Sequence, residues 1–485
     1  MPPVRKLAPP FALAMLVAGC AGPVAVSPPA LQGSALAGVG LALLESALVN
    51  DHDHTDPVEH PGASWRMHDV FWTNLPTDGT ALSPASEFII HGHYAYVSLF
   101  HPSGGFVIMD LTDPARPKEV GHFDAGTAYV NDVEVSPDGH WAFLPTSPIE
   151  TRENNPLGGG LPVLGDYGVQ VVDVSDVTAP KLAAVWIAPD PTRDPNSPRT
   201  LVSGLGYHRL DIEVIGGAQY VFGASLGYPR VDILRFDLAP VPRLVLVGVY
   251  LSDDAKDPTK DHASSPTGFG VHDVTVDPDP LEGFPLMAVA HWRSGAHFVD
   301  VSDPANPRFL GRWNDFPLPG GNVHNVEFTA IEGQRIAVAV PEYPGGDAQG
   351  AVWVVNVTDF ANASLLGSWS LPGSHPTGGA AAATRNHVFS TDRTLLRNGT
   401  LFDAHFHAGA IVLDIATLSK AAAPEMLGFV EPQGQARVPY ANIQANPYVY
   451  DAIPYGPYLY YTDLTGGLRV AEMAPEVVRG NAWTG

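Results

Sequence analysis

One sequence motif, the repeat phrase, recurs along this chain with substitutions. It limits the fold more than any other feature of the sequence. The clearest copies are FVIMDLTDPARPKEVGHF from Phe106, VQVVDVSDVTAPKLAAVW from Val169 and AHFVDVSDPANPRFLGRW from Ala296. Each copy contains an apolar segment of strand character, a turn rich in Asp and Pro, and a second apolar segment. Weaker copies begin at Val354 and Ile411. The repetition predicts an array of similar units that share a core with their neighbours.

Two further apolar segments precede each copy, for example VHDVTVDP from Val271 and PLMAVAHW from Pro285. Four short strands repeated every roughly 40 to 70 residues are typical of a β-propeller blade. Six or eight blades are alternatives, because the stretch 372–400 is the least regular part of the chain. The count that fits best is seven blades, with inner strands that begin near Glu87, Tyr129, Gly206, Gly268, Asn322, Arg385 and Asn446.

The two ends of the repeat region are complementary. The last unit, PYLYYTDLTGGLRVAEM from Pro457, has no outer strand of its own, and the segment WRMHDVFWTNLP from Trp65 has no partner ahead of the first unit. We expect this N-terminal strand to complete the last blade and close the ring, since closure removes exposed sheet edges. The predicted fold is therefore an all-β, seven-bladed propeller over residues 65–475, followed by a C-terminal tail at 476–485.

Composition agrees with a large β domain and narrows the set of partners. The 485 residues include 49 Gly and 47 Pro, which is too many turn formers for a helical fold. Acidic residues outnumber basic ones 51 to 26, giving a net charge of −25. Nucleic acids and anionic membrane surfaces need clustered Lys and Arg, so neither is expected to bind. The expected partner is a protein or a small-molecule ligand.

The N-terminus has the features of a targeting segment. A basic start at Arg5 and Lys6 and an apolar stretch at 11–17 precede Cys20, the only cysteine of the chain. The sequence LVAGC at 16–20 resembles the bacterial lipobox, which implies removal of a signal peptide at 1–19 and lipidation of Cys20. An ordinary secretory signal with an incidental cysteine is the alternative.

If the lipobox is used, residues 20–64 form a lipidated tether and a leader rich in His and Asp, with an apolar piece around Leu41 to Leu48. The protein would then be anchored in the bacterial cell envelope, facing the periplasm or the cell surface. Its contact with the membrane would be through the N-terminal lipid alone.

The phrases MDLTDPARPKEVGHF and VDVSDPANPRFLGRW, together with the closing YLYYTDLTGGLRVAEM, resemble the LVIVD-repeat family of bacterial surface lipoproteins. The resemblance extends over roughly Asp51 to Met473 and implies a surface or periplasmic β-propeller. It implies no defined activity, so function has to be argued from the side chains.

Alignment of the units places histidine at the start of four consecutive inner strands, which line the channel of a propeller. A second set of polar residues follows the next strand in several units and is expected at the same rim. Imidazole and carboxylate groups without thiolates suit Zn, Cu, Fe or Ni. A row of inherited histidines that hydrogen-bond neighbouring blades is the structural alternative. The candidate ligands are His208, His272, His324, His387, His291, His405, Glu342 and Asp463.

Two classes of function are compatible with these features. We favour a lipid-anchored binding or scaffold propeller with a histidine-lined metal or ligand site, because it requires only the fold and the anchor. The alternative is a metal-dependent (Cu, Zn or Fe) oxidoreductase or hydrolase that uses the same histidines. It would be similar in outline to methanethiol oxidase and selenium-binding proteins, whose reactive cysteine this chain lacks. The fold does not decide between the two.

Overall fold

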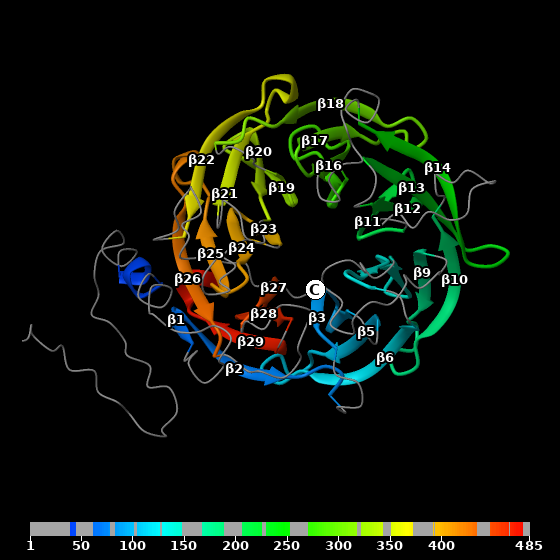
Figure 1. Ribbon diagram of the computed structural model, residues 1–485, viewed down its shortest axis with the longest axis horizontal. Helices are drawn as coiled ribbons and strands as arrows, with labels where there is room; N and C mark the ends of the chain where they lie inside the picture. The colour runs from blue at the N-terminus through cyan, green and yellow to red at the C-terminus, as the bar shows by residue number, and fades with distance from the viewer. Residues whose placement is uncertain are drawn as a thin grey trace, which may run out of the picture.

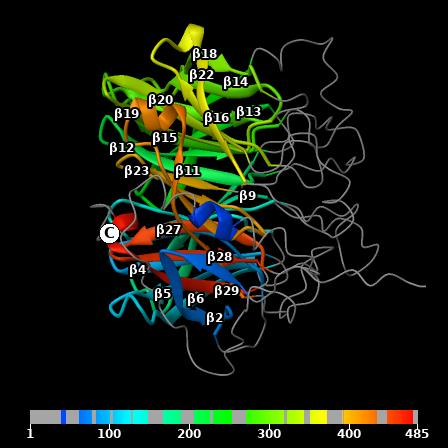
Figure 2. The same ribbon diagram turned by 90° about the vertical axis from the view of Figure 1, so that its left-hand side faces the viewer.

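Seven antiparallel sheets surround a central axis, and each is a meander whose first strand lies nearest that axis (Figure 1). Viewed from the side, the sheets form a disc (Figure 2). The seven-bladed, all-β propeller predicted from the repeats is therefore confirmed. The computed structural model describes residues 39–44, 62–77, 83–100, 104–126, 129–147, 167–188, 206–225, 229–252, 270–317, 322–342, 351–371, 391, 393–433, 447–464 and 466–478.

Within each blade, the strands follow one another in chain order from the channel outward. The first three blades contain β3 (Ala85–His91), β4 (Tyr94–Leu99), β5 (Gly104–Asp110) and β6 (Lys118–Gly126); β7 (Glu134–Val135), β8 (Trp141–Pro145), β9 (Gly168–Asp173) and β10 (Lys181–Ile187); and β11 (Arg209–Ile215), β12 (Ala218–Ala224), β13 (Arg230–Asp237) and β14 (Arg243–Leu251). The fourth and fifth contain β15 (Asp273–Pro278), β16 (Pro285–His291), β17 (Gly295–Asp300) and β18 (Arg308–Trp313); and β19 (Asn325–Ile331), β20 (Gln334–Val340), β21 (Ala351–Asn356) and β22 (Ser364–Ser370). The sixth and seventh contain β23 (Thr394–Arg397), β24 (Thr400–Ala404), β25 (Ala410–Asp414) and β26 (Glu425–Glu431); and β27 (Val449–Tyr455), β28 (Tyr458–Asp463) and β29 (Gly467–Met473).

Two N-terminal strands extend the last two blades. β2 (Met67–Thr73) pairs with β29, so the seventh sheet takes its outer strand from the N-terminal side of the chain. β1 (Ala63–Trp65) pairs with β26 and adds a fifth strand to the sixth sheet. The two ends of the repeat region are thus held together by backbone hydrogen bonds.

Helix is a minor part of the described structure. The short helices η2 (Phe360–Asn362) and α3 (Leu418–Ala422) lie between the third and fourth strands of their blades, and α4 (Pro475–Val478) follows β29. Residues 39–44, within the apolar part of the leader, are also helical. Leu44 in this segment is fully buried and packs in an apolar cluster with Trp65. None of the helices in the described ranges is long and apolar enough to cross a membrane.

The recurring Asp of the repeat phrase shapes the turn after the third strand of a blade. Oδ1 of Asp110 accepts a hydrogen bond from the Thr112 N–H at 2.8 Å, and Oδ1 of Asp300 accepts one from the Ser302 N–H at 2.9 Å. A carboxylate that bonds the backbone two residues later stabilises a tight turn. The repeat therefore keeps Asp at this place for a local structural reason.

The recurring Gly in the fourth strand allows neighbouring blades to approach closely. A Cβ atom at Gly311 would lie 1.9 Å from the Phe360 carbonyl oxygen, and one at Gly248 would lie 1.9 Å from that of Pro304. Both carbonyls belong to the turn of the next blade. Only a residue without a side chain fits such a contact with backbone.

The apolar core is divided among the interfaces between blades. One cluster, for example, joins Phe298 and Trp313 of the fourth blade to Val326 and Trp353 of the fifth. Sheets with two apolar faces explain why the strands read as nearly continuous apolar runs rather than strict alternations.

The predicted start of the sixth blade, near Arg385, lies outside the described residues. Within them, the first strand of this blade is β23, which begins at Thr394. The expected ligand His387 lies outside the described residues, as do Cys20 and the signal peptide at 1–19. The short β23 and its irregular upstream sequence gave no clear period from which to set the register.

Candidate metal site at the channel mouth

Histidine immediately precedes the inner strand in three consecutive blades. The backbone N–H groups of His208, His272 and His324 donate to the carbonyls of Ala224, Ala290 and Val340 at 2.8, 2.9 and 2.8 Å. These equivalent bonds place the three side chains at the same end of the channel. All three are buried. We refer to this end as the mouth.

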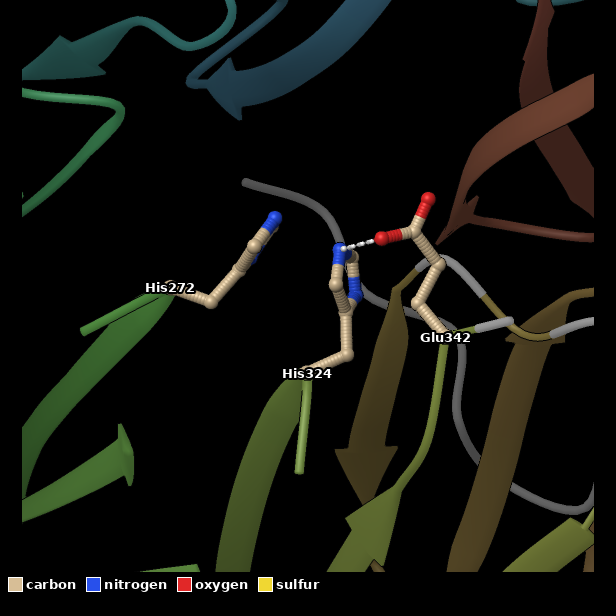
Figure 3. A group of neighbouring side chains, drawn as sticks. All are labelled: His272, His324 and Glu342. Atoms are coloured by element: carbon tan, nitrogen blue, oxygen red, sulfur yellow. Dashed lines mark ion pairs between the residues drawn. The ribbon is translucent and has the colours of Figure 1, made fainter. Parts of the chain in front are cut away.

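Two of these histidines converge with a carboxylate (Figure 3). The ligand-type atoms of His272, His324 and Glu342 all lie within 4.8 Å of one another. Glu342 follows β20, and its Oε2 lies 3.4 Å from Nε2 of His324. The rings of His272 and His324 have their centroids 3.6 Å apart. In the described part of the chain this is the group of three that could hold a metal ion.

The group is somewhat wider than a closed metal site. Bonds of about 2.1 Å from Zn²⁺ in tetrahedral geometry place ligand atoms about 3.4 Å apart. Glu342 and His324 already have this spacing, with Oε2 3.4 Å from Nε2. Because the three ligand atoms lie within 4.8 Å of one another, the widest pair would need to approach by up to roughly 1.4 Å to enclose an ion.

The protonation of the histidines also suits a cation. Burial, together with the neighbouring His324 and His208, holds the pKa of His272 well below its ordinary value. Burial and the Arg209 guanidinium lower the pKa of His208 to about 3. Both imidazoles are therefore neutral at pH 7, the form in which nitrogen ligates a metal. Nδ1 of His272 is buried and makes no hydrogen bond within the described structure.

His208 lies beside this group rather than within it. Its ring centroid is 4.5 Å from that of His272, with the two planes at 74°. On its other side the ring faces Tyr129, at 6.3 Å and nearly parallel. His208 thus links the three ligand-type residues to an aromatic side of the mouth.

Three of the predicted candidates have other surroundings. His291 Nε2 lies 3.0 Å from the Ser252 hydroxyl, in the interface between blades three and four. His405 Nδ1 lies 3.0 Å from Oδ2 of Asp403. Asp463 Oδ1 accepts a hydrogen bond from the Tyr448 N–H at 3.1 Å, and its Oδ2 lies 3.3 Å from Arg469 Nε. The described structure does not bring these three residues to the group of His272, His324 and Glu342.

A register difference of one residue accounts for this separation. Ala290 pairs with Asp273 and Val340 pairs with Asn325, so Ala290 and Val340 are equivalent. His291 is one residue beyond Ala290, whereas Glu342 is two residues beyond Val340. Because successive side chains point to opposite sides, the true equivalents of Glu342 are Trp292 in blade four and Phe406 in blade six. Trp292 indeed stacks on His272, with centroids 5.0 Å apart.

The residue after each histidine belongs to a polar belt that crosses the channel beneath the mouth. Arg209 forms ion pairs with Glu87 of blade one and with Asp273 of blade four, the latter at 3.2 Å. Arg393 lies 3.3 Å from Glu87 and 3.4 Å from Asp451. The belt consists of Glu87, Asp132, Arg209, Asp273, Asn325, Arg393 and Asp451, one from each blade.

The belt side chains also form hydrogen bonds to neighbouring blades, mostly to backbone N–H groups. Asp132 accepts a hydrogen bond from the Leu210 N–H at 3.0 Å, and Asp451 accepts one from the Phe88 N–H at 3.1 Å. Asp273 accepts one from Nδ2 of Asn325 at 2.9 Å. The Asp and Asn that follow the histidines therefore serve the assembly of the ring.

Sequence reasoning missed the aromatic residues of the mouth and the arginines of the belt. Counting two residues past Ala290 and Ala404, rather than one, would have found Trp292 and Phe406. No local pattern in the sequence marks Arg393, because its partners Glu87 and Asp451 come from other blades.

Comparison with known proteins identifies the repeat. The LVIVD repeat family matches residues 84–125 and 288–315. No curated protein sequence matches the chain. Among solved structures, a protein from Lactobacillus plantarum is similar to 74% of this chain over 87% of its own, with 12% identity and a TM-score of 0.46. The chain thus carries LVIVD repeats, and they are built into a seven-bladed β-propeller.

Proposed function

We propose that this protein is a binding propeller that holds a divalent transition-metal ion at the mouth of its channel, with His272, His324 and Glu342 as ligands. The observation that carries the proposal is the convergence of three ligand-type groups, from two neighbouring blades, within 4.8 Å. Two imidazoles and one carboxylate form a recurrent ligand set for zinc and for non-haem iron.

The links between blades favour this proposal over a purely structural row of histidines. A structural row would be expected to hydrogen-bond neighbouring blades through its buried nitrogens. Nδ1 of His272 makes no such bond in the described structure, although the same holds for Nδ1 of His291 and Nε2 of His405 outside the site. The belt residues already supply the links between blades, so the histidines are not needed for that purpose.

Three protein ligands also favour one second candidate, a metal-dependent oxidoreductase or hydrolase. Structural zinc sites usually have four protein ligands, whereas catalytic sites keep a position open for water or substrate. The same open position would let a binding protein take up a ligand on the metal. Turnover of a substrate by the metal-loaded protein would distinguish the two.

We also propose that the propeller is tethered to the cell envelope by a lipid on Cys20, on the extracytoplasmic side. The support is the lipobox-like sequence LVAGC at 16–20 and the lack of any other cysteine. The variant Cys20→Ala should be released from membranes in a fractionation experiment. Continued membrane association of that variant would exclude the lipid anchor.

Metal analysis tests the proposed site. The full chain, purified without a histidine tag or chelators, should contain or take up close to one equivalent of Zn²⁺, Fe²⁺ or Cu²⁺. The double variant His272→Ala/His324→Ala should bind the ion more than about 100-fold more weakly, because even outer-shell partners are worth about 10- to 100-fold.

A matched control distinguishes loss of the proposed site from loss of any two histidines. The double variant His68→Ala/His122→Ala removes two exposed histidines, 52% and 58% exposed, and should leave metal binding unchanged. Equal metal loss in both double variants, or uptake unaffected by loss of His272 and His324, would exclude the site. Circular dichroism would show that each variant is folded.

A further inference from the structure

A groove lies on the outer wall of the propeller, between blades three and four, where β14 and β18 are the outermost strands (Figure 1). Its volume is about 870 Å³, within the range of about 300 to 1,000 Å³ that is common for sites of small organic molecules. Residues 249–251 line one side, residues 307–312 line the other, and His297 of β17 also contributes. Because the inner strands line the channel, this groove is separate from the mouth.

The basic residue Arg312 of this groove is a departure from the repeat. It comes two residues after the one that the register shift of the fourth strand skips, and it pairs with His297. The residues at the equivalent position of the other blades are His122, Val185, Val249, Ser368, Phe429 and Trp72. Among these seven, Arg312 alone carries a fixed positive charge. The packing of a blade therefore does not call for a cation at this position.

The second basic residue of the groove, Arg308, belongs to the repeat instead. It forms an ion pair with Asp300, the turn-forming Asp of its own blade, at 2.7 Å. The residues that pair with the repeat Asp in the first three blades are also basic, namely Lys118, Lys181 and Arg243. Arg308 thus has a structural role that is shared among blades, whereas Arg312 has none of this kind.

A chain of buried hydrogen bonds holds Arg312 beside the groove. Nη1 of Arg312 donates to Oγ of Ser294 at 3.1 Å. Oγ of Ser294 lies 2.9 Å from Nε2 of His297, and Nδ1 of His297 lies 2.9 Å from the hydroxyl of Tyr250 on β14. Ser294, His297 and Tyr250 are all buried. In blades one, five and six the residue equivalent to His297 is apolar, namely Val107, Trp353 and Ile411. The fold of a blade does not require this polar chain, which instead fixes the position of the guanidinium.

Exposed apolar surface lies next to this cation. The side chain of Phe309 is 45% exposed, and its ring meets that of His297 nearly edge-on with centroids 5.7 Å apart. Phe309 and His297 are therefore on the same side of the sheet as Arg312. Val249 and Leu251, on the opposite wall, are exposed apolar residues as well. A fixed guanidinium beside apolar walls matches a molecule with an anionic end and an apolar body.

We propose that this groove is a second binding site, independent of the metal site, for a small amphipathic carboxylate such as a medium-chain fatty acid. The carboxylate pairs with the guanidinium of Arg312, and the alkyl chain lies over Phe309 toward β14. Guanidinium and carboxylate form strong charge-assisted hydrogen bonds. Each CH₂ group that the groove buries strengthens binding by up to roughly 4-fold. Because the chain has a net charge of −25, binding of an anion depends on this local cation.

Three probes test the two ends of the ligand separately. Octanoate and octan-1-ol share the apolar chain, whereas octanoate and butyrate share the carboxylate. Titration calorimetry on the metal-free full chain should show that octanoate binds more tightly than either. Arg312→Met keeps the length of the side chain and removes its charge. It should weaken octanoate binding by roughly 10-fold or more, because hydrogen bonds to charged groups are worth about that much. Arg243→Met, which removes a 55% exposed arginine of the same outer wall, should leave octanoate binding unchanged.

A second variant keeps the test decisive if Arg312→Met does not fold by circular dichroism. Phe309→Ala changes an exposed side chain, so it should fold, and it should reduce the preference for octanoate over butyrate. An unchanged preference in that variant, or octanoate that binds no better than octan-1-ol to the parent chain, would overturn the inference. Full octanoate binding by a folded Arg312→Met chain would also overturn it. The double variant His272→Ala/His324→Ala should bind octanoate as the parent does, and loss of binding there would place the carboxylate at the mouth instead.

Discussion

The mouth and the belt are neighbouring layers of the same channel, and consecutive residues of the same chain segments build them. His272 is followed by Asp273, and His324 by Asn325. In the belt, each described side chain reaches another blade, as Asp273 does through Arg209 and Asn325. In the mouth, the side chains converge on a point instead. A shift of one residue along a strand thus separates the polar groups that hold the ring together from those that could hold a ligand.

The largest effect on stability is expected in the belt. Arg209 is fully buried and is paired with Glu87 and Asp273. Arg209→Met leaves the buried Asp273 without its cation and Glu87 with Arg393 alone, and breaking a buried pair from one side costs about 3 to 5 kcal/mol. Urea unfolding followed by tryptophan fluorescence should show this loss.

The matched control for that variant is an exposed arginine. Arg308 forms an ion pair with Asp300 at 2.7 Å, but its side chain is 69% exposed. Exposed ion pairs contribute roughly 0 to 1 kcal/mol to stability, so the free energy of unfolding of Arg308→Met should be close to that of the parent chain. Similar losses in the two variants would contradict the distinction between the belt and the surface.

Two adjacent residues give the sharpest comparison of the layers. Asn325 donates to Asp273 and accepts from the Thr394 hydroxyl at 2.7 Å, all in buried surroundings. Asn325→Ala should cost about 1 to 3 kcal/mol, since it leaves buried polar groups unpaired, and should keep metal uptake. His324→Ala should have the opposite effects, with metal binding lost and the urea midpoint of unfolding little changed. If His324→Ala instead lowers the urea midpoint more than Asn325→Ala does and leaves metal uptake unaffected, the mouth is a structural layer like the belt.

The repeat itself is the part of this structure that could be predicted from sequence. Nearly continuous apolar strands, the Asp that forms a turn and the Gly that allows the next blade to approach are local features. Asp300 and Gly311 can be recognised from their neighbours in the chain. Seven blades follow from repeating such a unit. Each signal is independent of the rest of the ring.

The site was harder to predict because it depends on single-residue register between blades. His272, His324 and Glu342 were among the predicted ligands, but so was His291, which bonds Ser252 in the interface between blades three and four. Sequence alignment treats His291 and Glu342 as equivalent, although they are offset by one position. The positive φ of Trp292, which brings an aromatic ring to the mouth, has no signal in the sequence.

A deeper layer of the channel should respond to pH. Burial raises the pKa of Glu327 from its ordinary 4.5 to about 8. Between these values the folded protein keeps a proton that the unfolded chain has lost, so stability should fall as pH rises across this window. One proton changes the free energy of unfolding by at most about 1.4 kcal/mol per pH unit. Glu327→Gln, which is neutral throughout, should reduce this slope in urea midpoints measured from pH 5 to 9.

An exposed carboxylate provides the comparison for Glu327. The side chain of Glu282 is 72% exposed, so Glu282→Gln should leave the pH profile of the parent chain unchanged. A Glu327→Gln variant with the same slope as the parent would mean that Glu327 is ionised in the folded protein at neutral pH. The channel would then carry more negative charge than its burial implies.

The smallest expected effect concerns the interface between blades three and four, where His291 lies apart from the mouth. Ser252→Ala removes the hydroxyl 3.0 Å from Nε2 of His291, and one such hydrogen bond contributes about 0.5 to 1.5 kcal/mol. Urea unfolding should show a loss of this size, while metal uptake stays that of the parent chain, because His291 is not among the converging ligands. A change in metal uptake would instead show that His291 contributes to metal binding. The one-residue offset between His291 and Glu342 would then not distinguish structural residues from metal ligands at this interface.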